Sequence, residues 1–223
     1  MSITSYAELQ AAIVDWLARP NDPALSAVVP DLIRLAEARI MHGAGEAGAA
    51  LYSSPLRVRQ METRATVVLS AEYVAVPADF MELRELKINT AREQKLVYVT
   101  PQHFAETAAA QLGGVPRFYT LVGGSLRFGP FPSGSPPLTA ELLYYAKLPP
   151  LTEAAPANWL LASAPNVYLF GALLEASAYV RDQGQLAEWS TQYAAAVGAL
   201  QAQDRRARNG GAPLIMRPAG ATP

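Results

Sequence analysis

The chain has 223 residues, of which 51% are hydrophobic and 17% are charged. These proportions exclude a disordered protein and fit one or two compact units with buried cores. Eighteen Lys and Arg against nineteen Asp and Glu leave a net charge of -1. That balance excludes the global positive field that drives non-specific duplex binding. The absence of cysteine excludes disulfides and thiolate metal sites.

The first fifty residues predict two helices that pair with each other. Ser5 and Glu8 have capping-box spacing, so the first helix is expected to start at Ser5. Prolines within residues 19–23 are expected to break it. A second helix is expected from about residue 30 to residue 42. Residues 1–50 therefore form the first part of a predicted helical bundle.

After Pro55 the hydrophobic spacing changes from a helical period to a period of two. Residues 61–69 alternate apolar and polar side chains, which predicts a half-buried strand. Further elements are expected from turn signals: short strands at 73–76, 83–88 and 96–99, and a short helix at 101–111.

A tight hairpin is predicted around Gly123 and Gly124, which join the β-prone runs 118–122 and 126–128. Primed hairpin turns need positive φ, which glycine adopts without steric cost. A third strand is expected at residues 138–145. We expect residues 51–155 to form one β-rich domain, either a single antiparallel sheet or a small barrel.

The chain then returns to helices, expected at residues 165–180 and 185–208. Small side chains in the former predict close helix packing, and the latter has an apolar seam that is expected to pack on the N-terminal pair. Residues 156–209 thus complete the predicted bundle. The predicted fold class is α+β: a helical bundle from the N- and C-terminal helices, an antiparallel β-rich insertion, and an extended C-terminal arm at residues 210–223.

Two features of the sequence have some of the residues of a cofactor or metal site. The run from Gly43 to Gly48 matches G-x-G-x-x-G, but it follows a predicted helix, whereas a dinucleotide site needs the motif between a strand and a helix. His42 and His103 have no further ligands at zinc-site spacing. We therefore expect no cofactor and no metal.

Acidic pairs such as Glu82 with Glu85, or Glu62 with Asp79, are a possible glycosidase acid and base. They alternate with basic residues in the predicted strands, which is typical of solvated cross-strand charge pairs. These basic residues are Arg57, Arg59, Arg64, Arg84 and Lys87. We expect no catalytic residue and no enzyme.

Candidate docking residues lie near the C-terminus. The dense basic cluster at the end of the last predicted helix complements the helix dipole and is available to nucleic acid or to an acidic partner surface. Three large apolar residues in the tail, followed by an arginine, predict a docking peptide. The candidate residues are Arg205, Arg206, Arg208, Leu214, Ile215, Met216 and Arg217.

Several short motifs, spread over nearly the whole chain, together resemble the head-to-tail adaptor, or connector, proteins of tailed bacteriophages, especially short-tailed ones. The motifs are Tyr6-Ala7-Glu8-Leu9, Trp16-Leu17, Pro30-Asp31-Leu32-Ile33, Ala36-Glu37-Ala38-Arg39-Ile40, Arg59-Gln60-Met61-Glu62-Thr63, Val76-Pro77-Ala78-Asp79-Phe80, Pro116-Arg117-Phe118-Tyr119, Tyr144-Tyr145-Ala146-Lys147-Leu148-Pro149 and Asn158-Trp159-Leu160-Leu161. These are packing and turn residues, so the resemblance concerns assembly and not catalysis.

The resemblance implies a structural virion protein, assembled in the host cytoplasm. It implies a homo-oligomeric ring, twelve-fold in the family, that binds the portal protein, extends the DNA channel and connects to a downstream tail or nozzle protein. DNA would pass without sequence specificity, and the C-terminal arm would grip the portal.

An alternative class is a β-rich carbohydrate-active or receptor-binding tail-associated enzyme module. It requires a cleft with converging carboxylates or aromatic rings. Trp16, Trp159 and Trp189 fall in or beside predicted helices, which favours core positions.

The uncharged run 154–174 is interrupted by prolines, and residues 1–17 lack the pattern of a signal peptide, so no membrane association is expected.

Overall fold

A computed structural model describes residues 2–46, 51–89, 94–107, 114–131 and 137–209. It contains both helices and largely antiparallel sheets, which confirms the predicted α+β class. The chain divides into two compact units. The helical unit comprises Met1–Gln60 and Leu148–Pro223, and the β unit comprises Met61–Lys147.

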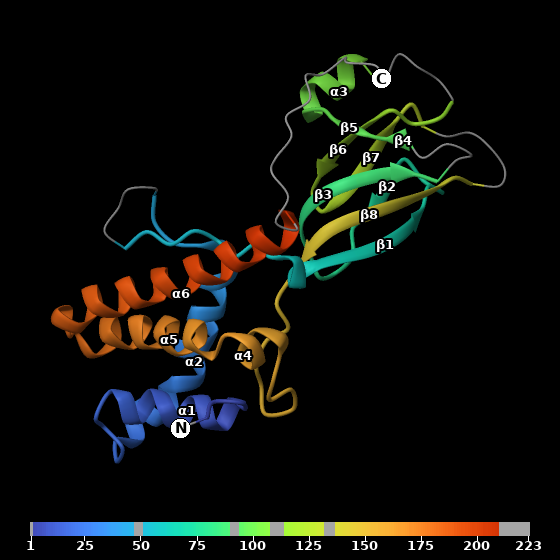
Figure 1. The fold of residues 1–223 in the computed structure, drawn as a ribbon. Coiled ribbons are helices and arrows are strands. Elements are labelled where there is room, and N and C mark those ends of the chain that lie inside the picture. The colour runs from blue at the N-terminus through green and yellow to red at the C-terminus, as the bar shows by residue number, and fades with distance from the viewer. Residues whose placement is uncertain (1, 47–50, 90–93, 108–113, 132–136, 210–223) are drawn as a thin grey trace. The chain divides into compact units, whose positions relative to one another are not determined.

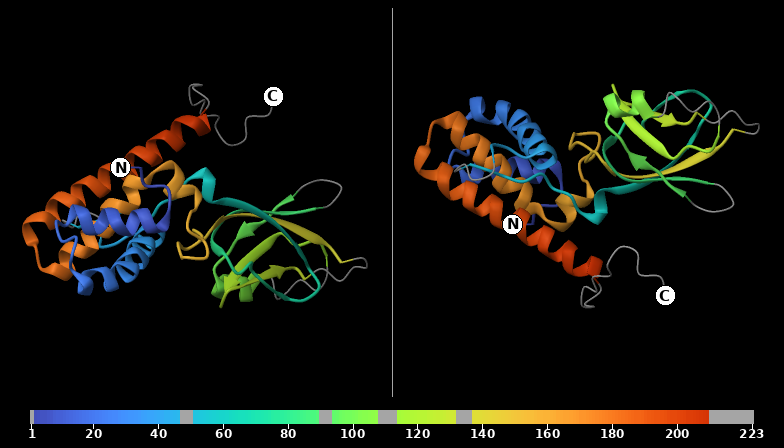
Figure 2. Two further views of the ribbon diagram at one scale, coloured as in Figure 1. Left: turned by 90° about the horizontal axis from the view of Figure 1, so that it is seen from below. Right: turned by 90° about the horizontal axis from the view of Figure 1, so that it is seen from above.

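The helical unit is organised around one central helix, α5 (Figures 1 and 2). α5 packs against α1, α2, α4 and α6, so helices from both ends of the sequence share a core. α6 packs mainly on α5, whereas the sequence had placed it on the N-terminal pair. The bounds are α1 (Tyr6–Trp16), α2 (Pro23–His42), α4 (Trp159–Ser163), α5 (Pro165–Val180) and α6 (Gln183–Asn209).

The predicted capping box at the start of α1 is confirmed. Ser5 Oγ accepts from the Glu8 N–H at 3.3 Å, and Glu8 Oε2 accepts from the Ser5 N–H at 3.1 Å. The helix then buries Tyr6, Leu9 and Ile13 on one face. The start of this helix was therefore correctly predicted from local sequence.

The start of α2 was predicted wrongly, because it begins at Pro23 and not near Pro30. Asp22 Oδ1 accepts from the Leu25 N–H at 3.0 Å, and Pro23 suits the first helical position, where no N–H is needed. Pro30 removes one helical hydrogen bond, but the turns around it bury Leu25 and Val29, so packing carries the helix through.

Small side chains allow α5 to approach its neighbours closely. A Cβ atom on Gly171 would lie 3.3 Å from both Ala36 Cβ of α2 and Tyr193 Cε2 of α6. Ala172 and Ala176 are fully buried within the unit. The small residues of α5 therefore serve packing inside the chain, as expected for a bundle.

The β unit contains two four-stranded sheets, with strand orders β1-β8-β3-β4 and β2-β7-β6-β5. The expectation of one antiparallel sheet or a small barrel is thus corrected. β5 and β6 pair in parallel because the intervening α3 (Pro101–Thr107) returns the chain in the same direction. The strands are β1 (Glu62–Val68), β2 (Tyr73–Ala75), β3 (Phe80–Ile88), β4 (Gln94–Lys95), β5 (Val97–Tyr98), β6 (Phe118–Val122), β7 (Ser125–Gly129) and β8 (Thr139–Ala146).

The predicted hairpin is confirmed as β6 and β7. Val122 pairs with Ser125 across the turn, and Gly123 and Gly124 have φ values of 56° and 78°. Both glycines adopt the positive φ that a primed turn requires.

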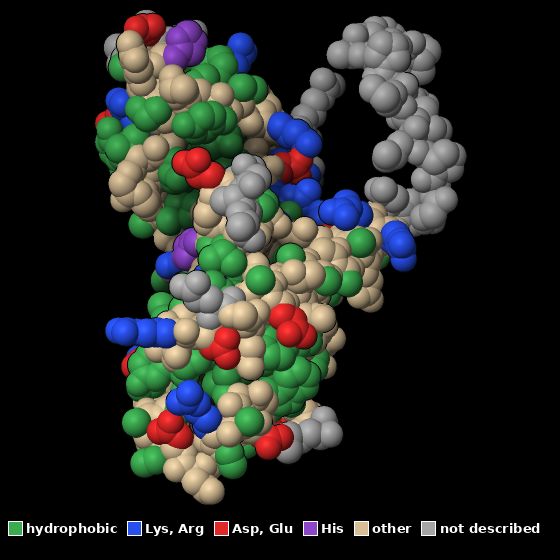
Figure 3. All heavy atoms as spheres, turned by 90° about the vertical axis from the view of Figure 1, so that its left-hand side faces the viewer, with side chains coloured by type: hydrophobic (Ala, Val, Ile, Leu, Met, Phe, Trp, Pro, Cys, Tyr) green, Lys and Arg blue, Asp and Glu red, His purple; other side chains and the backbone are tan. Residues whose placement is uncertain are grey.

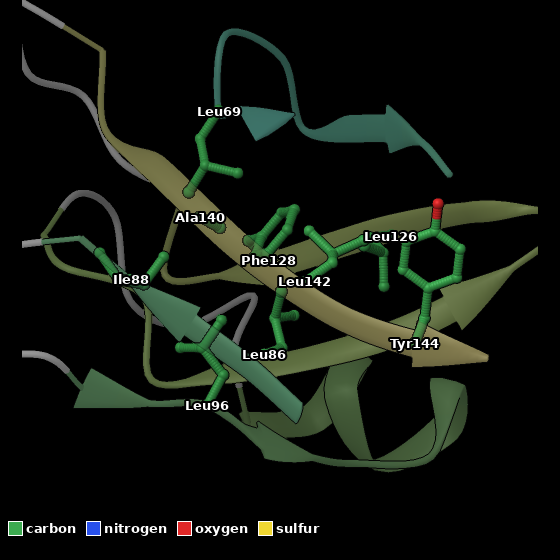
Figure 4. Close-up of a cluster of buried hydrophobic side chains, with 9 residues drawn as sticks. All are labelled: Leu69, Leu86, Ile88, Leu96, Leu126, Phe128, Ala140, Leu142 and Tyr144. Atoms are coloured by element: carbon green, nitrogen blue, oxygen red, sulfur yellow. The ribbon is translucent and has the colours of Figure 1, made fainter. Parts of the chain in front are cut away.

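Side chains from both sheets meet in an apolar core (Figure 4). Leu86 and Ile88 come from β3, Leu142 from β8, and Leu126 and Phe128 from β7, and all five are at most 2% exposed. Leu69, Leu96, Ala140 and Tyr144 complete this cluster. The β unit is therefore held together by apolar contacts between its two sheets.

Candidate docking site at the end of the last helix

The segment that precedes the β unit runs along one side of α6. Gln201 Nε2 donates to the Pro55 carbonyl at 3.1 Å, and the Leu56 N–H donates to the Ile40 carbonyl at 2.8 Å. The segment therefore bridges α6 and the end of α2, and it brings Arg59 to the last turns of α6.

Asp204 is the centre of a charged cluster at this place. Its Oδ1 accepts from the Arg59 N–H at 3.0 Å and from Arg59 Nε at 3.3 Å, and its Oδ2 accepts from Arg208 Nε at 2.5 Å. Burial acts to raise the pKa of the Asp204 carboxyl, but the hydrogen bonds and charges of Arg208 and Arg59 hold that pKa below its usual value. Asp204 is thus a buried anion that joins two arginines from distant parts of the chain.

The three predicted basic residues of α6 do not form one cluster. Successive helical residues are rotated by about 100°, so Arg208 and Arg205 lie on the same flank of α6, about 40° and about 100° from Asp204. Arg206 is rotated by about 200° and lies on the opposite side. Arg205 and Arg206 are both exposed. Figure 3 shows Lys and Arg side chains in blue on the right-hand side of this face of the molecule.

Arg57 and Arg59 were expected to form cross-strand charge pairs, and this is wrong. Arg57 Nη1 donates to the carbonyls of Met41 and Leu56, at 2.9 and 2.8 Å, within the helical unit. Both arginines precede β1 and belong to the helical unit. The sequence did not predict Arg59 as a neighbour of α6 because Arg59 is 145 positions from Asp204 in the chain.

The other basic residues of that set do pair with acids in the β unit. Arg84 contacts Glu62, and Lys87 Nζ lies 3.2 Å from Glu85 Oε2. Arg64 Nη1 lies 3.9 Å from Glu141 Oε1 on the neighbouring strand. The expected cross-strand charge pairs are therefore confirmed for Arg64 and Arg84, whereas Lys87 pairs with Glu85 of its own strand β3.

The remaining predicted docking residues, Leu214, Ile215, Met216 and Arg217, lie outside the described residues. Their role in docking stays a prediction.

A second buried carboxylate, Glu37 of α2, anchors the segment that follows the β unit. Its Oε1 accepts from the Leu151 N–H at 2.8 Å and from the Tyr168 hydroxyl at 3.2 Å. Asn158 Nδ2 donates to the Tyr168 hydroxyl at 2.7 Å, and Asn158 Oδ1 caps α4. Burial raises the pKa of Glu37 despite these hydrogen bonds.

The glycine motif that begins at Gly43 has a structural explanation. Gly43 ends α2 with a φ of 74°, and a Cβ there would lie 2.5 Å from the Ser53 carbonyl, so close backbone approach explains this glycine. No group of three or more potential metal ligands occurs within the described residues. In the same residues no helix is long and apolar enough to cross a membrane.

The alternative function, a carbohydrate-active or receptor-binding module, needs converging carboxylates or aromatic rings, so the surroundings of Asp79 and of the tryptophans are relevant to it. Asp79 Oδ1 accepts from the Tyr144 hydroxyl at 2.9 Å, and burial, this bond and the nearby charge raise the pKa of Tyr144 to about 12. Trp16 is 47% exposed, so its expected core position is wrong. Its ring lies 5.8 Å from that of Trp189 and 6.0 Å from that of Phe170, in a cluster of three helices.

The chain combines a helical unit and a β unit in one α+β fold. Residues 4–217 match the family model of the SU10 adaptor protein. The chain therefore belongs to the SU10 adaptor family, whose members are bacteriophage head-to-tail adaptors with a structural role in the virion. A search of curated proteins finds no match.

Proposed function

We propose that this protein forms a closed homo-oligomeric ring beneath the portal of a short-tailed phage, extends the DNA channel and carries the next tail component. The family match over residues 4–217 carries this proposal. The resemblance to phage head-to-tail adaptors implies that the ring is twelve-fold and that it assembles in the host cytoplasm. Identical subunits close into a ring when a contact between unlike surfaces rotates by a fraction of a full turn.

The portal contact is assigned to the end of α6 and the tail that follows. Arg205 and Arg208 supply charge, and Leu214, Ile215 and Met216 supply apolar anchors next to Arg217. Burying each large apolar side chain contributes about 1.5 to 3 kcal/mol before the cost of ordering the segment. The near-neutral net charge of the chain suits a channel through which DNA must slide.

The test is the mass of the full chain, alone and mixed with the portal ring of the same phage, by native mass spectrometry. A defined multiple of the chain on each portal ring supports the proposal. Single copies, open filaments or no association contradict it.

A second measurement concerns the tail alone. Deleting residues 210–223 is expected to leave the unfolding midpoint unchanged but to weaken portal association and the retention of DNA by particles. Unchanged association and retention would assign the portal contact elsewhere.

A further inference from the structure

The arginines at the end of α6 divide into two sets according to the side of the helix. We propose that Arg59, Arg205 and Arg208 form one docking face that binds carboxylates on an acidic surface of the partner protein, and that Asp204 positions this face. The inference rests on the proposed portal docking, and it adds the face, a residue from another segment and the chemistry of the partner.

The geometry of the helix defines the face. Arg208 and Arg59 both bond to Asp204, and the Arg59 side chain remains 51% exposed, so its guanidinium is accessible beside α6. Arg205 lies on the flank next to this pair. Arg206 points to the other side of α6, away from Asp204.

Carboxylates fit this face better than DNA phosphates do. The guanidinium group pairs with either anion through parallel N–H donors. However, the face stands directly before the segment with Leu214, Ile215 and Met216, and large apolar anchors suit a protein surface. The chain as a whole carries a net charge of -1, which gives no attraction for a duplex beyond the face itself.

Asp204 acts as a positioning residue because its carboxylate is almost completely buried. Its side chain is 6% exposed and is used inside the chain to hold Arg59 and Arg208. Fixing these long side chains before binding lowers the entropy cost of ordering them on a partner. The carboxylate therefore raises affinity for acids through geometry, although its own charge opposes them.

The first test compares adjacent arginines in the full chain binding to the immobilised portal ring of the same phage. Arg205→Glu is expected to weaken binding about tenfold, and the loss is expected to shrink as salt is raised. Arg206→Glu changes the charge equally on the opposite side and is the matched control, with less than about a twofold change expected. Equal effects at both positions overturn the proposed face.

The second test separates positioning from charge. Asp204→Asn removes a negative charge, so long-range attraction alone predicts tighter binding to an acidic surface. The positioning role predicts binding at least about fivefold weaker. Tighter or unchanged binding overturns the role of Asp204.

Arg59→Gln provides an independent variant in case Asp204→Asn unfolds the chain. It keeps the backbone N–H that bonds to Asp204 and removes only the guanidinium, so the unfolding midpoint should change little. Binding about fivefold weaker supports the face, and unchanged binding overturns the inclusion of Arg59.

Fluorescence anisotropy with a mixed-sequence DNA duplex tests the alternative that this face binds DNA. Loss of duplex binding by Arg205→Glu with unchanged portal binding overturns the acidic partner. If the wild-type chain does not bind the portal at all, the proposed function fails together with this inference. If it binds without dependence on the face, only the inference fails.

Discussion

The helical unit and the β unit both have apolar cores, but they differ in the polar contacts that they bury. The helical unit buries two carboxylates, Glu37 and Asp204, and each accepts a backbone N–H from a segment more than a hundred positions away. The described core of the β unit is apolar, and its ion pairs lie at more exposed positions. Directional polar contacts therefore fix loops onto helices in one unit, whereas shape and apolar area hold two sheets together in the other.

This difference predicts which perturbations should change the stability of each unit. Substitutions that leave a cavity should act on the unit whose core contains them, and changes of pH should act mainly on the helical unit. The two responses are separable because Trp16, Trp159 and Trp189 all belong to the helical unit. Tryptophan fluorescence reports that unit alone, and far-UV circular dichroism reports both.

The largest effect is expected for Phe128→Ala in the core between the sheets. Phe128 is 2% exposed, so truncation should destabilise the β unit by about 3 to 5 kcal/mol. In urea, the transition seen by circular dichroism should move to lower concentration while the fluorescence transition stays in place. Val68→Ala, at a position 48% exposed, is the control with little change. If both signals moved together for Phe128→Ala, the units would unfold as one block.

The next effect is expected for Glu37→Leu in the helical unit. The Leu151 N–H and the Tyr168 hydroxyl would lose their acceptor, at a cost of about 2 to 4 kcal/mol. The fluorescence transition in urea should shift accordingly. Glu37→Gln keeps an acceptor oxygen and should lose less, so equal losses for the two variants would show that the hydrogen bonds do not matter.

The pH dependence of the helical unit should have opposite signs at its two carboxylates. The pKa of Glu37 is raised in the folded state, so its contribution to stability is present at low pH and is lost as pH rises through the raised pKa. The pKa of Asp204 is lowered, so its contribution is present at neutral pH and is lost as pH falls through the lowered pKa. Unfolding midpoints by fluorescence should fall less with rising pH in Glu37→Gln than in the wild type. A parallel pH profile for the variant argues against a buried titrating Glu37.

A smaller effect is expected for Gly171→Val in α5. The added side chain would press on Ala36 and Tyr193 and should cost about 1 to 3 kcal/mol, seen as an earlier fluorescence transition. Gly198→Ala in α6 is the control, because a Cβ there meets nothing within 4 Å and the helix should gain about 0.5 to 1 kcal/mol. Destabilisation by the control and not by Gly171→Val would contradict the close packing of α5.

The smallest effect is expected for Ser5→Ala at the start of α1. Loss of the side-chain cap should cost about 1 kcal/mol, measured as a shift of the fluorescence transition. Ser5→Asp preserves a capping acceptor and should restore the wild-type midpoint. Failure of this rescue would mean that packing of Tyr6 and Leu9, and not the cap, fixes the start of α1.

Local chemistry explains what the sequence predicted correctly. The capping box at Ser5 and the paired glycines at 123 and 124 act over a few residues, so spacing alone specified the helix start and the hairpin. Local sequence places the start of α2 at Pro30, because proline disfavours a helix interior, whereas tertiary packing carries the helix through this residue.

Long-range contacts explain what the sequence did not predict. The division into two sheets depends on which distant strands pair, as when β1 pairs with β8. Arg59 was assigned to a strand because of its neighbours, and only the fold brings it to Asp204. A buried carboxylate such as Asp204 looks like any helical acid until its partners from another segment are known.

The most direct test of the adaptor role is electron cryo-microscopy of the full chain bound to the portal ring of its phage. The expected map shows a closed ring of copies of this chain attached to the portal and surrounding an open channel, with the end of α6 at the portal contact. A map with isolated copies, with no closed ring, or with the ends of α6 turned away from the portal would contradict the account.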